Sequence, residues 1–482
     1  MGARIRKYWQ AHPKFWRGVL LAMVIIVIGA VILLEFLSRG AAVIFNHEMQ
    51  EQDMLRGTIT ADKILADLTG HVMFEHLVWK NPDGVTILEV PSGSLQVRPW
   101  DIVTKNIKST TIQAITLNDA QVSLRLADDM QVDFVRQSRD MNKLEDDPED
   151  KDWRNKVSLT GKSEEERKAI GEWRRKRQAA RLQKRWDNFN RQGRKIRTKL
   201  TLANCRMEVF FKDRHYLMDH VELQTDINTN DKMKIKLETG GFGGTMIGNG
   251  IRLNGEVDFT AEDIPVCDLW LRFIDVDPSS LDMGVNIHDK MTLDSHISGP
   301  LTTLSGEGHV QMDELHIPGL DFSNVIGDLY YDGEDLLFKD VTADVFGGKL
   351  VAEGTYDLDT RYYQLQGHGS NLQTAKALPG SSLYCSVDMD VNMYSRGSSR
   401  ETTVWGSFAS QPGFYKLLPF NKLAGKFTNE YRNLTFNDVV MELPGFTAKT
   451  DSLSIKQGKL AFAPIHLFDE KGQPLTVIEN YR

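Results

Sequence analysis

The pattern that decides the fold lies between Leu301 and Leu372, which read LTTLSGEGHVQMDELHIPGLDFSNVIGDLYYDGEDLLFKDVTADVFGGKLVAEGTYDLDTRYYQLQGHGSNL. Apolar and polar residues alternate here in short runs, such as Val310 and Met312 or Leu336 and Phe338. Strand side chains point to opposite faces in turn, so each run predicts a strand with one apolar face. Turn signals separate the runs at Pro318-Gly319, Asp332-Gly333 and Gly347-Gly348. The stretch is therefore predicted to be an antiparallel meander.

The same alternation extends over most of the chain. It begins at Gly70, stops between Asp140 and Thr198, and resumes at Lys199. The predicted fold class is mainly β: an N-terminal transmembrane helix, then an elongated, curled antiparallel sheet that forms an open groove, with one inserted basic α-helix. The apolar face can be covered by a second sheet, as in a sandwich, or by an apolar molecule that fills a trough. The residue pattern fits both arrangements.

The first 37 residues predict a membrane anchor. Residues 1–17 are basic without an acidic side chain, and residues 18–37 are almost wholly apolar over about the length that crosses a bilayer. The positive-inside rule places the N-terminus in the cytoplasm and the bulk of the chain beyond the membrane. A cleaved signal peptide is the alternative. The anchor is predicted to consist of Val19, Leu20, Leu21, Val24, Ile25, Ile26, Val27, Ile28, Val31, Ile32, Leu33 and Leu34.

Residues 140–198 interrupt the strand pattern. An acidic linker comes first, and then Ser163 and Glu166 form a capping-box sequence that predicts the start of a helix reaching about Arg191. This helix either touches anionic headgroups at a membrane surface or is a charged excursion that packs one short stripe on the sheet. The basic side chains that would face a membrane are Arg174, Arg175, Lys176, Arg177, Arg181, Lys184 and Arg185.

Composition and motifs exclude several function classes. The net charge of −8 argues against a chain built to bind nucleic acid. Three distant cysteines, Cys205, Cys267 and Cys385, fit neither a disulfide framework nor a zinc site. Asp388 and Asp390 begin a sequence like a calcium loop, but the glycine and glutamate that such a loop needs are missing. No catalytic or nucleotide-binding motif is present, so we predict no enzyme activity, no cofactor and no metal.

The predicted organisation follows the changes in pattern. It consists of a cytoplasmic basic segment at 1–17, a transmembrane signal anchor at 18–37, a membrane-proximal β region at 38–139, an acidic linker with the basic helical insertion at 140–198, and a repetitive β-groove region at 199–482.

An N-terminal anchor followed by a meander of this style resembles the AsmA-like family. The resemblance is carried by Ile297-Ser298-Gly299-Pro300 with Gly306-Glu307-Gly308, Gly327-Asp328-Leu329 with Phe338-Lys339-Asp340-Val341, Phe346-Gly347-Gly348-Lys349-Leu350, and Gly354-Thr355-Tyr356-Asp357-Leu358. It implies an inner-membrane protein whose β-groove lies in the periplasm and helps to move phospholipid toward the outer membrane. The insertion at 140–198 departs from the family pattern, and the chain is short beside the longest members.

We therefore predict an inner-membrane-anchored periplasmic protein that binds phospholipid acyl chains and supports lipid transport and outer-membrane biogenesis. The alternative is a scaffold that assists outer-membrane protein assembly by offering a sheet edge to a barrel partner. The predicted groove lining consists of Val310, Met312, Leu329, Tyr331, Leu336, Phe338, Val387, Met389 and Val391.

Overall fold

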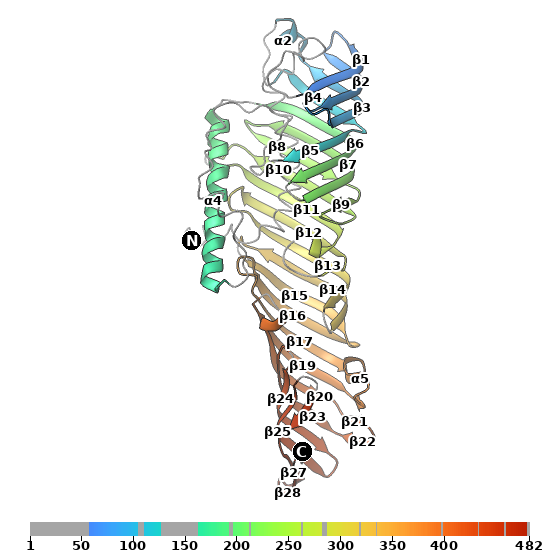
Figure 1. Ribbon diagram of the computed structural model, residues 1–482, viewed down its shortest axis with the longest axis vertical. Helices are drawn as coiled ribbons and strands as arrows, with labels where there is room; N and C mark the ends of the chain where they lie inside the picture. Colours follow the sequence, from blue (N-terminus) through green and yellow to red (C-terminus); the bar gives the residue numbers. More distant parts are fainter. Residues whose placement is uncertain are drawn as a thin grey trace. The chain divides into compact units, whose positions relative to one another are not determined.

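The computed structural model of the chain describes residues 57–104, 110–126, 162–191, 196–211, 214–261, 264–281, 287–317, 320–333, 335–396, 399–431, 433–456 and 459–479 (Figure 1). The described part is mainly β, as predicted, with few helices. Its contacts divide the chain into two compact units. Unit 1 comprises Met1–Met283 and Met291–Gly306, and unit 2 comprises Gly284–Lys290 and Glu307–Arg482. The strand region expected at 199–482 is thus shared between the two units.

Unit 1 is built on one large sheet. Its strands are β1 Thr58–Ala66, β2 His71–Lys80, β3 Thr86–Val97, β4 Ile112–Asn118, β5 Gln121–Leu126, β6 Arg197–Phe211, β7 Arg214–Asn228, β8 Lys232–Glu238, β9 Phe242–Gly244, β10 Gly250–Asp258, β11 Val266–Val276 and β12 Met291–Pro300. Consecutive strands mostly pair, but β4 and β5 both pair with β3, β8 and β9 both pair with β7, and β10 pairs with β8. Short helical segments lie at α2 Pro99–Val103 and η3 Pro278–Leu281.

The sheet of unit 1 is mixed, which corrects the purely antiparallel prediction. Both β4 and β5 pair with β6 in parallel. A parallel pair needs a long crossover connection, which usually contains a helix. Helix α4, Glu164–Arg191, lies in the connection from β5 to β6. The segment predicted as a helical insertion is therefore also the crossover connection that allows β6 to pair in parallel with β4 and β5.

The start of α4 is the predicted capping box. The Ser163 N–H donates to Glu166 Oε2 at 2.9 Å, and the Glu166 N–H donates to Ser163 Oγ at 3.2 Å. Each side chain thus satisfies a backbone donor that the first helical turn leaves free. Trp186, on the same helix, stacks on Phe259 with ring centroids 5.8 Å apart. The helix is therefore capped at its N-terminus by local bonds and contacts unit 1 near its C-terminus through Trp186.

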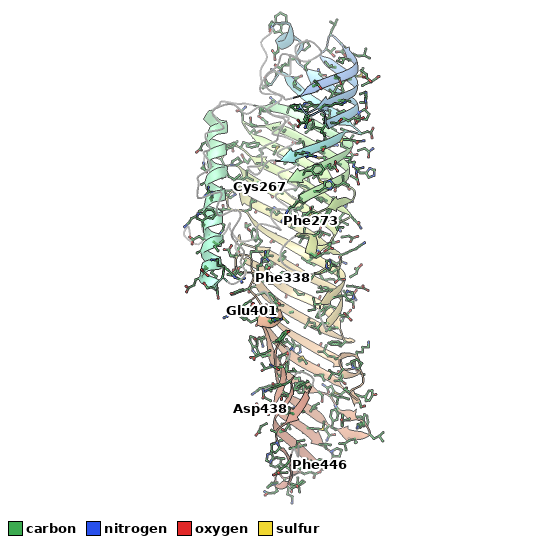
Figure 2. All side chains as sticks on the ribbon, viewed as in Figure 1. Cys267, Phe273, Phe338, Glu401, Asp438 and Phe446 are labelled. Atoms are coloured by element: carbon green, nitrogen blue, oxygen red, sulfur yellow. The ribbon has the colours of Figure 1, made fainter. Side chains whose placement is uncertain are left out.

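Unit 1 has a closed apolar core. Five leucines from five strands stand directly opposite one another, and none is more than 7% exposed: Leu202, Leu223, Leu237, Leu253 and Leu271. We call them the leucine row. Phe273 and Cys267, labelled in Figure 2, lie on β11 and are also buried. Burial of apolar area at this density is the main source of stability for the unit.

Unit 2 is formed largely by an antiparallel meander of the kind that was predicted for residues 301 to 372. Its strands are β13 Ser305–Ile317 (which starts at the boundary), β14 Leu320–Tyr331, β15 Asp335–Val345, β16 Gly348–Asp357, β17 Tyr363–Gln373, β19 Ser386–Ser395, β20 Thr402–Ser410, β23 Lys422–Glu430, β24 Asn433–Leu443, β25 Phe446–Lys456, β26 Lys459–Phe462, β27 Ile465–Asp469 and β28 Pro474–Ile478. From β14 to β25 each strand pairs with the next large strand in antiparallel register.

A three-stranded sheet accompanies the large sheet in unit 2. It is formed by β18 Leu383–Tyr384, β21 Gly413–Tyr415 and β22 Leu418–Phe420. The short helices α5 Thr374–Ala377 and η4 Ser399–Glu401 complete the described elements of the unit. Within those elements no second sheet of comparable size covers the large one, so unit 2 is not a sandwich of two similar sheets.

Bulges occupied by asparagine or aspartate curl the sheets. Each lies at a shift in strand register and has a left-handed backbone with φ of 51–55°: Asn204, Asp275, Asn324, Asp340, Asn371 and Asp438. Asparagine and aspartate tolerate this conformation better than other residues with a side chain. A bulge bends its strand and increases the local twist.

The bulges also preserve the apolar face. Phe338 and Val341 are three residues apart, a spacing that would put them on opposite faces of a regular strand. The register shift at Asp340 brings Phe338 opposite Gly354 and Val341 opposite Ala352, which lie on the same face of β16. The extra residue is therefore what allows one face of β15 to stay apolar along its length.

The predicted anchor at 18–37 lies outside the described residues. Among the helices that are described, none combines the length and the apolar character required to cross a bilayer.

Candidate ligand-binding face of unit 2

The strand register brings most of the predicted groove residues onto one face of unit 2. Leu329 lies opposite Phe338, and Tyr331 lies opposite Leu336. Met389 and Val391 on β19 reach the same face through their partners on β17, Gly369 and Gly367. Val387 joins this face beyond the bulge at Asn371. Val310 and Met312 share one face of β13.

A line of directly opposed residues runs through the middle of this face. It crosses eight strands and consists of Val341, Ala352, Gly367, Val391, Gly406, Phe427, Phe436 and Leu453. We call it the central row. Every member is apolar or glycine, so the row offers an uninterrupted apolar path across the strands.

The central row has small residues between larger ones. Ala352, Gly367 and Gly406 belong to it, whereas the adjacent rows on the same strands carry Leu350, Leu365, Met389, Met393 and Phe408. Glycine also has a packing role here, because the ring of Phe408 lies over Gly425 and that of Phe427 lies near Gly406. Aromatic rings that cover a glycine on the neighbouring strand help to hold register in a curved sheet.

Exposure distinguishes this face from the core of unit 1. The leucine row is buried throughout, but seven of the eight residues of the central row are only half-buried, and Phe427 is the exception at 8%. Of the predicted groove residues, Phe338 and Val391 are likewise half-buried, whereas Met312, Leu336 and Val387 are buried. An apolar row of this length that stays partly accessible to solvent is typical of a site that receives an apolar partner.

The opposite face of unit 2 carries most of the polar and charged side chains, although Val351 and Trp405 are also exposed on it. His368 Nδ1 lies 2.7 Å from Asp390 Oδ1, and Val351 lies directly opposite His368. The hydrogen bond with His368 lowers the pKa of the Asp390 carboxyl. The Asp388 carboxylate accepts a hydrogen bond from the N–H of Asn371 at 2.9 Å. These two aspartates are thus engaged in cross-strand bonds on the polar side of β19.

Carboxylates pair with histidines elsewhere on the described strands. His76 Nδ1 lies 2.8 Å from Asp62, His296 Nε2 2.5 Å from Asp268, His309 Nδ1 2.9 Å from Asp328, and His316 Nδ1 2.7 Å from Asp289. The hydrogen bond to the partner carboxylate raises the pKa of His76 and of His316. Within the described residues no group of three or more potential ligands is arranged to hold a metal ion.

All three cysteines are buried and free. Desolvation raises the pKa of each thiol, to about 12 for Cys267. A thiol with a raised pKa has little of the reactive thiolate form near neutral pH. The cysteines therefore act as small apolar residues.

The basic helix is only partly available to an anionic surface. Arg175 is 3% exposed, so its charge does not belong to a surface that could meet headgroups. Lys176 pairs with Glu172 at 2.7 Å, and the Arg177 guanidinium stacks over the Trp173 ring at 5.1 Å. The side chains of Arg174, Arg181, Lys184 and Arg185 lie outside the described part. The burial of Arg175 could not be predicted from the sequence, because the helical pattern does not show what packs on α4.

Two features of the described residues were not predicted from the sequence. The bulges were one, although asparagine or aspartate at a break in the period-two pattern could have indicated them. The other is a group of exposed apolar side chains around β21 and β22, where Phe414-Tyr415-Lys416-Leu417-Leu418 shows no alternation.

Comparisons with protein-family models, with curated proteins and with solved structures found no match.

Proposed function

We propose that unit 2 binds phospholipid, with acyl chains lying along the central row. The supporting observation is that the central row crosses eight strands and is half-buried except at Phe427, while the leucine row of unit 1 is buried. Unlike a protein segment, an acyl chain presents no backbone polar groups to such a face. The resemblance to the AsmA-like family points to the same ligand.

The energy available is sufficient for stable binding. Burying one methylene group is worth about 0.8 kcal/mol, so ten methylenes along the row would contribute about 8 kcal/mol. Part of this is offset by ordering the chain and the side chains around it. The polar headgroup would remain in water at the side of the face.

The row is long enough for more than one acyl chain. Its eight strands are separated by seven steps of about 4.8 Å, which amounts to roughly 34 Å. One leaflet contributes about half of the 30 Å hydrocarbon thickness of a bilayer, or roughly 15 Å. About two acyl chains could therefore lie end to end. A path that holds lipids in series suits transport along the sheet.

We place this activity in the envelope of a bacterium with two membranes. The proposal comprises anchoring in the inner membrane through residues 18–37, a periplasmic location for both units, and a contribution to lipid transport and outer-membrane biogenesis. The function requires binding and no catalytic group, so we propose that the protein is not an enzyme.

Photo-crosslinking in cells tests the ligand directly. Benzoyl-phenylalanine would be placed at position 391 of the full-length chain in one strain and at position 351 in another, with phospholipid radiolabelled. Val391 is on the central row, and Val351 is 51% exposed on the opposite face of the same unit. We expect labelled lipid on the chain crosslinked at 391 and none at 351. Labelling at neither position, or equally at both, would refute binding along the row.

Two substitutions test the row without relying on the crosslinker. Val391→Asp places a charge on the path, and Ala352→Leu fills the path while keeping it apolar. For these variants the crosslinker is placed at the adjacent position, Met389. Both substitutions should lower the amount of crosslinked lipid, and the control substitution Val351→Asp should not. Circular dichroism of the purified variants checks that each remains folded. If Ala352→Leu binds as much lipid as the parent chain, the acyl chain does not lie over the small residues.

An assembly scaffold is the second candidate function. Strand β28 pairs with β27 in the described sheet, and all five residues of β28 are exposed. A free edge of this kind can add a strand from another protein. Benzoyl-phenylalanine at Val477 would then capture an outer-membrane barrel protein, whereas position 391 would capture no lipid.

A further inference from the structure

A cluster of exposed apolar side chains surrounds the three-stranded sheet of unit 2. Its members come from the segment after α5, from β18, and from β21, β22 and the turn between them: Leu378, Tyr384, Phe414, Tyr415, Leu417 and Leu418. Leu417 is 94% exposed, and the others are 41–57% exposed. We call this cluster the tip (Figure 1, around α5, β21 and β22). Tyr384 and Phe414 lie on one face of the small sheet, and Tyr415 and Leu418 lie on the other. Single exposed leucines are common, but six large apolar side chains around one small sheet indicate a surface that makes contact with both faces.

The strands that carry the tip are anchored by buried side chains and hydrogen bonds. Phe420, at the end of β22, is 2% exposed and packs in a cluster with Cys385, Val387 and Leu443. Thr374 Oγ1 donates to the Leu383 carbonyl at 2.8 Å and accepts from the Cys385 N–H at 2.9 Å. Because these contacts fix the strands from below, the exposed side chains are presented at a defined place on unit 2.

The segments that form the tip carry lysine and no acidic side chain, although Lys422 at their end lies directly opposite the exposed Glu442 of β24. Lys376, Lys416 and Lys422 are exposed, and the segments 374–387 and 411–423 contain no aspartate or glutamate. The Lys416 ammonium lies 5.8 Å from the centre of the Tyr415 ring. The chain as a whole carries a net charge of −8, so this local composition differs from the average.

We propose that the tip docks on the surface of a bilayer that contains anionic phospholipid. Leucine and phenylalanine would enter the boundary between headgroups and acyl chains, while tyrosine rings prefer the headgroup level. Each lysine near an anionic bilayer adds attraction, and its long stem allows the ammonium to reach the phosphates. This inference rests on the tip alone and holds whether or not the central row carries lipid.

The buried cysteines make a clean reporter experiment possible. Leu417→Cys would introduce a single accessible thiol, because the three native cysteines are at most 9% exposed. The full-length chain would be labelled there with the polarity-sensitive fluorophore NBD and held in nanodiscs of phosphatidylcholine. Val351→Cys, on the polar face of unit 2, is the matched control. Vesicles of phosphatidylcholine, with or without phosphatidylglycerol, are then added.

We expect the fluorescence at position 417 to rise and shift to the blue with vesicles that contain phosphatidylglycerol, and to change little with phosphatidylcholine alone. Raising the salt concentration should weaken the response, because it screens exposed charges. The label at position 351 should not respond. The absence of a response at 417, or identical responses at 417 and 351, would overturn the proposal. An equal response to both vesicle types would refute the role of the lysines.

Substitutions on the chain labelled at position 384, in the variant Tyr384→Cys, complete the test. Leu417→Asp should weaken vesicle binding at least about tenfold, since it removes a large apolar side chain from the contact. Lys416→Glu should weaken binding to anionic vesicles alone. If the response of the label instead follows protein concentration without vesicles, the tip is a contact between copies of the chain and the proposal fails.

Discussion

Replacing Leu237 by alanine tests the difference between the two apolar faces. Leu237 is 3% exposed and lies directly opposite Leu223 and Leu253 in the leucine row. Truncation of a buried leucine removes its transfer free energy and leaves a cavity, which together cost about 2–5 kcal/mol. Leu365, on the face of unit 2, is only half-buried. Leu365→Ala should therefore cost less, about 1 kcal/mol.

Hydrogen exchange followed by mass spectrometry measures both units in one sample, because peptides from β8 and β17 are separate. A loss of 2 kcal/mol or more corresponds to an acceleration of about 30-fold or more in the exchange of core amides. We expect this for β8 peptides in Leu237→Ala, and an acceleration of about fivefold for β17 peptides in Leu365→Ala. Equal accelerations would show that the two faces are equally packed, and the argument for an available face in unit 2 would fail.

Three further predictions follow from the described contacts. Ser163→Ala removes the cap of α4 and should destabilise that helix by about 1 kcal/mol, seen as faster exchange of its first turn, with Ser163→Asp retaining most of the stability. The pKa of His316 should lie above 6.5 in an NMR titration and return toward that value in Asp289→Asn; since the folded pKa is raised, the stabilisation is full below about pH 6.5 and is lost as the pH rises through the folded pKa. A thiol reagent at neutral pH should modify none of the three cysteines of the native chain and all three after denaturation, and rapid modification of native Cys267 would contradict its burial.

Much of the strand architecture could be predicted because alternation is a local property. Leu329, Tyr331, Leu336 and Phe338 share a face since residues two apart on a strand always do, and pairing in antiparallel register joins the faces of neighbouring strands. The capping box of α4 could likewise be predicted from the sequence, because its two hydrogen bonds link residues only three apart. These features depend on short stretches of chain and on the geometry of the backbone.

The tertiary structure decided the rest. The parallel pairing of β6 with β4 and β5 depends on where the chain returns after α4, which no local pattern specifies. The same is true of exposure: Leu237 and Val391 both occupy apolar positions in alternating strands, yet one is buried and the other half-buried. Residue type and period determine which side of a strand is apolar, whereas burial is set by what packs over that side from elsewhere in the chain.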